Sequence, residues 1–178
     1  RRIIVPEAHM ETVHLALKKR LATTKIGHPA LKETQMGALV SLEQRDDVRA
    51  QAKIIAKECE LIFDGEESCQ VEGADPERGA FLAPMLFACL DPDRALVVHK
   101  EEAFGPVATL MAYRDIDHGI ALLNRGGGSL VGSVFTHDPT VARSVVIGAG
   151  AFHGRLYFND RVSQVASTGH GSPLPHLV

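Results

Sequence analysis

The sequence predicts an α/β fold with a largely parallel sheet. Short runs of β-branched and aromatic residues alternate with longer segments in which apolar residues recur at helical spacing. With 178 residues, of which 45% are hydrophobic, the chain is long enough for one sizeable buried core. We therefore expect residues 1–178 to form a single domain.

The first quarter of the chain supplies one strand and one helix. Ile3–Val5 is strand-like, and a helix is expected from about Glu7 to Leu21. Apolar residues of this segment share one helical face: Met10, Val13, Leu17 and Leu21.

A second helix is indicated by the spacing of Ser41 and Gln44, which is that of a capping box. Its apolar face is expected to carry Val48, Ala52 and Ile55. It leads to a strand at Leu61–Phe63. The polar stretch Asp64–Gly79 is punctuated by glycines and a proline, so we expect a solvent-facing connection there.

The second half of the chain alternates in the same way. A helix should start near Asp115 or Asp117 and end at Gly126, and Asp138-Pro139 provides a cap and a first-turn proline for another. The expected strands are Phe81–Ala88, Val107–Tyr113, Leu130–Thr136 and Leu156–Phe158.

Charge and cysteine content exclude several classes of function. With 19 basic and 22 acidic residues, the chain has no positive excess to bind nucleic acid. The three cysteines include no C-x-x-C pair, so they predict neither a disulfide framework nor a thiolate metal site. The nine histidines are scattered without the spacing of metal ligands. No segment has the roughly 18 apolar residues of a membrane span. We expect a soluble cytoplasmic protein and, because the chain opens on Arg1-Arg2 and a strand, a piece of a longer one.

The most informative motif is Glu101-Glu102-Ala103-Phe104-Gly105-Pro106-Val107, immediately before an expected strand. One carboxylate can accept hydrogen bonds from both hydroxyls of a ribose, and a ring two residues later can pack beside a nicotinamide. Taken alone, the motif favours a plainer interpretation, in which Glu102 is an exposed charge and Phe104 a core residue entering a strand.

Agreement at several places in the same order favours the first interpretation. The motif resembles the E-x-F-G-P-V signature of the aldehyde dehydrogenase family. A second segment resembles that family's G-P-L-V-S helix entry, with Ala38 in place of the usual proline. Further segments that resemble this family are Arg1–Pro6, Met36–Ser41 with Gln44, Gly79–Pro84, Ser129–Thr136 and Leu156–Asn159. The resemblance implies a three-layer fold, an open twisted sheet of mostly parallel strands between flanking helices.

By motif position, the resemblance also implies a site. Glu102 would bind the ribose hydroxyls of NADP or NAD, Phe104 would lie near the nicotinamide, and Leu130 would make an apolar contact to the same ring. Asn159 to Ser172, with Asn159 and His170 as named candidates, would line the substrate pocket. The family's reaction joins a cysteine thiolate to the aldehyde, transfers hydride to the cofactor and hydrolyses the thioester. Its nucleophile and general base are expected upstream of Arg1, so we assign no catalytic residue and expect the isolated chain to be inactive.

Two other features invite functional claims. His170 lies between glycines and could reach a ligand, but histidines on such loops are usually solvated. Gly126-Gly127-Gly128 suggests phosphate binding, but no Lys-Ser/Thr or opening helix follows, and a turn is the better interpretation. Cys59, Cys69 and Cys89 are expected in the second helix, the polar connection and a strand, as structural thiols.

Within the family, the chain most resembles the dehydrogenase half of bifunctional phenylacetate-degradation proteins, which also carry an enoyl-CoA hydratase-like domain. The segment Ser167–Pro175 is the most discriminating, because ordinary members continue toward P-F-G-G. The implied substrate is a CoA-linked semialdehyde from phenylacetate or other aromatic breakdown, and the implied parent is a homo-oligomer. Alternatives are a semialdehyde dehydrogenase of the benzoyl-CoA pathway and a non-catalytic interaction domain.

Overall fold

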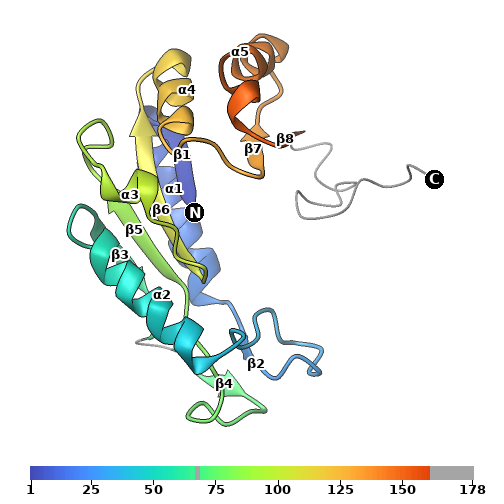
Figure 1. The fold of residues 1–178 in the computed structure, drawn as a ribbon. Coiled ribbons are helices and arrows are strands. Elements are labelled where there is room, and N and C mark those ends of the chain that lie inside the picture. The colour runs from blue at the N-terminus through green and yellow to red at the C-terminus, as the bar shows by residue number, and fades with distance from the viewer. Residues whose placement is uncertain (67–68, 161–178) are drawn as a thin grey trace. The chain divides into compact units, whose positions relative to one another are not determined.

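The computed structural model describes residues 1–66 and 69–160 and divides into two compact units, Arg1–Tyr113 and Arg114–Val178 (Figure 1). Each unit is described by itself, the second as far as residue 160. Assignment of the whole chain to one catalytic domain stays a prediction. Among the described helices, none is long and apolar enough to span a membrane.

A four-stranded sheet forms the centre of the first unit, in the order β1-β6-β5-β3. Strands β1 (Arg2–Pro6), β6 (Val107–Tyr113) and β5 (Met85–Cys89) run parallel to one another, and β3 (Glu60–Asp64) is antiparallel to β5. The expected mostly parallel sheet is confirmed, and the antiparallel β3 makes it a mixed one. The strand expected from Phe81 starts later, because ladder pairing begins at Met85.

Helix α1 (Met10–Ala22), preceded by the 3-10 turn η1 (Glu7–His9), covers one face of this sheet. Its expected apolar face is confirmed, because Met10, Val13, Leu17 and Leu21 all pack against a buried cluster. The buried members of that cluster are Val5, Phe63, Leu86 and Leu110.

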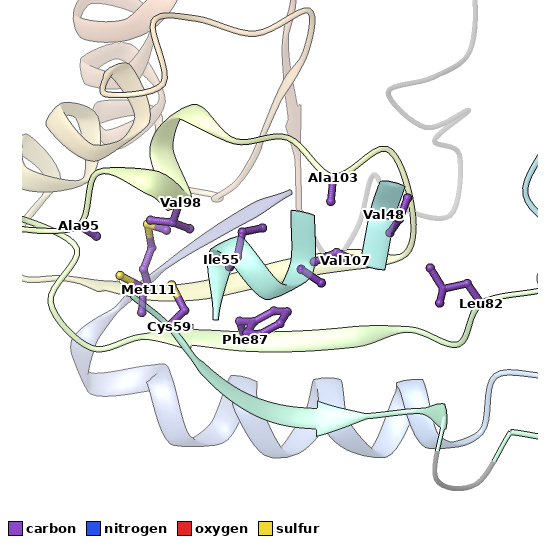
Figure 2. Packing of buried hydrophobic residues seen from close by; sticks show 12 residues of the cluster. Val48, Ile55, Cys59, Leu82, Phe87, Ala95, Val98, Ala103, Val107 and Met111 are labelled. Atoms are coloured by element: carbon purple, nitrogen blue, oxygen red, sulfur yellow. The ribbon is translucent and has the colours of Figure 1, made fainter. Parts of the chain in front are cut away.

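Helix α2 (Leu42–Ile55) covers the opposite face. Alternate residues of a strand point to opposite faces, so Phe87 of β5 and Val107 of β6 join the α2 cluster while Leu86 and Leu110 join that of α1. Figure 2 shows Val48 and Ile55 of the helix above Phe87, Val107 and Met111. The sheet between two helices is the predicted three-layer arrangement.

Three short elements of this unit were not expected. Strands β2 (Ile26–Gly27) and β4 (Val71–Glu72) form a small parallel sheet, and helix α3 (Val97–Lys100) follows β5. Strand β4 lies inside the stretch expected to be an irregular connection. A two-residue strand is defined by its partner rather than by its own apolar pattern, so local periodicity does not reveal it.

The second unit consists of two helices and a two-stranded parallel sheet. Strand β7 (Gly132–Phe135) pairs with β8 (Leu156–Asn159), and helices α4 (Ile116–Asn124) and α5 (Pro139–Ala149) pack together, with the 3-10 turn η3 (Gly150–Phe152) after α5.

The helix caps of this unit settle two expectations. Asp115 and Asp138 accept backbone hydrogen bonds as N-caps, at 2.8 Å from His118 and 2.7 Å from Thr140, as predicted. Helix α4 ends before the expected Gly126. The turn after α4 contains Gly127 and Gly128, whose φ angles are 72° and 112°. A residue with a side chain would be strained at these angles.

Candidate functional site

The turn between α3 and β6, residues 101–106, presents the predicted cofactor residues to solvent. Glu102 is exposed, and Phe104 is 71% exposed even though it precedes a buried strand. Ala103 between them is only 7% exposed and belongs to the α2 cluster. The interpretation of Phe104 as a core residue is therefore wrong, and the two side chains flank a residue that anchors the turn.

Backbone contacts hold residues 101–106 in shape, a segment that we call the cofactor turn after its predicted role. The amide of Gly105 donates to the carbonyl of Ala103 at 2.8 Å, and the amide of Met85 donates to that of Pro106 at 2.9 Å. A Cβ placed on Gly105 would lie 2.7 Å from Cγ1 of Val48, which is buried in α2. Glycine at this position lets the turn pack directly against the helix.

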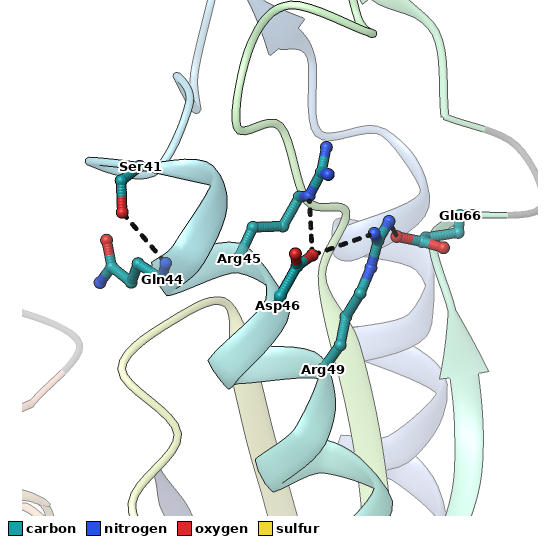
Figure 3. A network of polar contacts seen from close by, with 6 residues as sticks. All are labelled: Ser41, Gln44, Arg45, Asp46, Arg49 and Glu66. Carbon is teal, nitrogen blue, oxygen red and sulfur yellow. Dashed lines mark hydrogen bonds and ion pairs between the residues drawn. The ribbon is translucent and has the colours of Figure 1, made fainter.

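Gln44, whose spacing in the sequence indicated only a helix cap, also contacts this turn. Its side-chain Nε2 donates to the carbonyl oxygen of Phe104 at 2.9 Å, while its Oε1 accepts from the amide of Val40 at 3.0 Å. The expected cap is confirmed, because the backbone amide of Gln44 donates to Ser41 Oγ at 3.1 Å (Figure 3). The Gln44 side chain, however, reaches Val40 instead of closing a capping box on the Ser41 amide.

The first strand begins beside the cofactor turn. The backbone nitrogen of Arg1 donates to the carbonyl of Val107 at 3.0 Å. This bond places the start of β1 beside the cofactor turn.

Leu130 and Asn159 lie at opposite ends of the two-stranded sheet of the second unit. Leu130 precedes β7 and is 89% exposed, whereas Asn159 ends β8 opposite Phe135 and is 8% exposed. Ser129 anchors the Leu130 end, because its Oγ lies 2.7 Å from Nδ1 of His153. His170, and the part of the expected pocket lining from residue 161 to Ser172, lie outside the described residues.

The three cysteines occupy structural positions. Cys59 is buried in the turn after α2 rather than in the helix, Cys89 is buried at the end of β5, and Cys69 lies in the polar connection. A hydrogen bond from Cys59 to Cys89 raises the pKa of the Cys59 thiol and lowers that of Cys89. No group of residues suited to a metal ion occurs in the described ranges.

The chemistry of the cofactor turn follows from these positions. An exposed carboxylate can accept two hydroxyl hydrogen bonds, and an exposed phenyl ring two residues away offers a flat apolar surface. These groups fit a ligand that carries a vicinal diol next to a planar ring, as a nicotinamide riboside does.

Comparison with known proteins places the chain among relatives of similar sequence. The pattern described as the Aldehyde dehydrogenase family matches residues 1–171. "Protein MaoC" of Klebsiella aerogenes is 47% identical over 144 residues, covering 80% of this chain and 41% of that protein. The 3,4-dehydroadipyl-CoA semialdehyde dehydrogenase of Aromatoleum evansii is 34% identical over 175 residues, covering 98% of this chain and 34% of that protein. The chain thus spans less than half the length of either relative.

Solved structures agree with the sequence relatives. Succinic semialdehyde dehydrogenase from Streptococcus pyogenes, in complex with NADP+, is similar with a TM-score of 0.74 at 25% identity, covering 90% of this chain and 33% of that one. Aldehyde dehydrogenase C of Pseudomonas syringae, in complex with NAD+ and octanal, gives 0.73 at 29% identity, covering 89% and 31%. With the family pattern matched along nearly its whole length, this chain belongs to the aldehyde dehydrogenase family.

Proposed function

We propose that this chain forms one part of an NAD(P)-dependent aldehyde dehydrogenase that oxidises an aldehyde to a carboxylate. The observation that carries the proposal is the cofactor turn, which exposes Glu102 and Phe104 on either side of the buried Ala103. Glu102 binds the ribose hydroxyls, Phe104 packs beside the nicotinamide, and Leu130 makes an apolar contact to that ring. NADP+ and NAD+ each occur in a similar structure, so both are candidate acceptors.

The contribution of this chain to the reaction is orientation. When bound, the nicotinamide group supplies the hydride acceptor. A carboxylate that accepts hydrogen bonds from both ribose hydroxyls limits rotation of the sugar. Because the turn that carries this carboxylate is rigid, little conformational freedom of the turn or the cofactor remains to be lost during the reaction. The bonds at Gly105 and Pro106 and the packing on Val48 provide that rigidity.

The nucleophile of the proposed reaction is expected in the polypeptide before Arg1. The bond from the backbone nitrogen of Arg1 to the carbonyl of Val107 supports this placement, because it sets the start of β1 beside the cofactor turn. A segment that enters β1 here would carry its side chains beside the cofactor turn. None of the cysteines of this chain is proposed as the nucleophile.

We propose that the substrate is a CoA-linked semialdehyde formed in phenylacetate catabolism. The name of the Aromatoleum relative, a CoA semialdehyde dehydrogenase, supports the CoA-linked class. Another CoA-linked semialdehyde, such as one of the benzoyl-CoA pathway, is the alternative substrate. We also propose that the full-length protein is a cytoplasmic homo-oligomer and that it carries a hydratase-like domain.

The chain offers a matched pair of variants to test the function. In the full-length protein, Glu102→Gln should lower kcat/KM for NADP+-dependent aldehyde oxidation by about ten- to a hundredfold, the effect of losing a charged hydrogen-bonding group. Thioester hydrolysis should remain largely intact. Glu101→Gln makes the same charge change at the neighbouring exposed residue and should behave like the unaltered protein.

Two outcomes would count against this proposal. Unchanged steady-state kinetics with NADP+ in Glu102→Gln would remove the role assigned to that carboxylate. A full-length protein that binds neither NADP+ nor NAD+ and oxidises no semialdehyde would instead favour a non-catalytic interaction domain.

A further inference from the structure

One side chain connects the helix α2 entry to the cofactor turn. The amide group of Gln44 spans two backbone groups that are 64 positions apart in the chain, with Oε1 on the Val40 amide and Nε2 on the Phe104 carbonyl. Gln44 is half-buried and lies in the first turn of α2, which is held on the sheet by its buried residues Val48, Ala52 and Ile55. The side chain therefore leaves a fixed point and makes directed contacts at both of its polar atoms.

The two partners dictate the orientation of this amide. A backbone N–H can only donate and a backbone carbonyl can only accept, so one side-chain oxygen and one side-chain NH₂ are both required. A flipped amide would set donor against donor and acceptor against acceptor. Glutamate has the same shape but no donor, and at position 44 it would place a carboxylate oxygen against the Phe104 carbonyl.

We propose that Gln44 is a positioning residue for the cofactor site, because it holds the Phe104 carbonyl and thereby fixes where Glu102 and Phe104 point. This inference rests on the proposed function. Phe104 itself is 71% exposed, so its ring has little packing to define its position. The buried Ala103, the Gly105 contact with Val48 and the Gln44 bond define the turn instead. Gln44 acts through the turn in this proposal.

The substitution Gln44→Glu tests the proposal, with Ser41→Ala as its control. Ser41→Ala removes the side-chain cap of the same helix but leaves the Phe104 contact in place. In the full-length protein without aldehyde, Gln44→Glu should raise the dissociation constant of NADP+ by about three- to tenfold in isothermal titration calorimetry. Ser41→Ala should lower the melting temperature and leave that constant unchanged.

Hydrogen exchange supplies a readout that does not depend on the cofactor. Without NADP+, peptides that cover residues 101–107 should exchange faster in Gln44→Glu than in either Ser41→Ala or the unaltered protein. In steady-state kinetics, the KM for NADP+ should rise more than kcat falls, since the variant loosens the site before the cofactor binds.

The opposite results would overturn the proposal. If Gln44→Glu lowers the melting temperature as Ser41→Ala does, but changes neither NADP+ affinity nor exchange of the turn, Gln44 is only part of the helix cap. A normal affinity in Gln44→Glu alongside defective Glu102→Gln would refute the positioning role alone. If Glu102→Gln is also normal, the proposed function fails, and exchange at residues 101–107 still decides whether Gln44 fixes the turn.

Discussion

Replacing Gly105 by alanine tests whether close packing against α2 holds the cofactor turn. The new Cβ would lie 2.7 Å from Cγ1, 2.8 Å from Cγ2 and 3.3 Å from Cβ of Val48, all closer than ordinary van der Waals contact. Val48 is 1% exposed, and a β-branched side chain in a helix has essentially one rotamer. It cannot turn away, so the backbone of the turn must shift. Overpacking of this kind costs about 1–3 kcal/mol.

A double-mutant cycle isolates this clash. Val48→Ala removes both Cγ atoms and costs about 1–3 kcal/mol through lost burial and the cavity left behind. If the predicted contact is real, Gly105→Ala should add little in the Val48→Ala background, because the space it needs is already open. Gly37→Ala is the matched control, since a Cβ at Gly37 meets nothing within 4 Å.

Native-state hydrogen exchange of peptides from β5 and β6 would measure these free energies in the unit that contains the turn. The expected result is a large effect of Gly105→Ala, almost none of Gly37→Ala, and strong non-additivity with Val48→Ala. Additive effects, or a Gly105→Ala protein as stable as the unaltered one, would refute close packing as the reason for glycine at this position.

Two further predictions concern other parts of the chain. Asp115→Ala should destabilise the second unit by about 1 kcal/mol, because it removes the cap on the His118 amide, whereas Asp117→Ala should cost less; equal losses in urea unfolding would contradict the cap assignment. Burial and the charge of Glu66 raise the pKa of the Cys69 thiol, so its alkylation rate should keep rising at pH values where an ordinary thiol has levelled off. Buried Cys59 and Cys89 should react with the same reagent only on unfolding, as mass spectrometry of labelled peptides would show.

Local signals predicted much of the fold. The caps at Ser41, Asp115 and Asp138 each involve residues within a few positions of one another, and the structure confirms all three. The apolar faces of α1 and α2 were equally predictable, because helical periodicity assigns residues to a face without knowledge of the partner. The pairing of β2 with β4 was not, since it joins segments about 45 positions apart in register.

The candidate site was predictable to a different degree. Residue chemistry alone favoured a buried Phe104, which its exposure contradicts. Only the resemblance to a family placed its ring at a ligand, and that role stays a prediction. Gln44 escaped notice because its spacing from Ser41 already had a local explanation. Its contact with Phe104 joins residues 60 positions apart in the sequence, and no local pattern indicates a contact between residues so far apart.

The pairing of β1 with β6 also has a consequence for biosynthesis. The contact from Arg1 to Val107 closes 106 positions of chain, so β1 leaves the ribosome long before its partner strand exists. At about 5–20 residues per second, the delay is on the order of 5–20 seconds. During that interval Ile3, Ile4 and Val5 remain an unpaired apolar segment available to chaperones or to misassociation. The cofactor turn therefore takes its final form only once the last strand of the sheet has been synthesised.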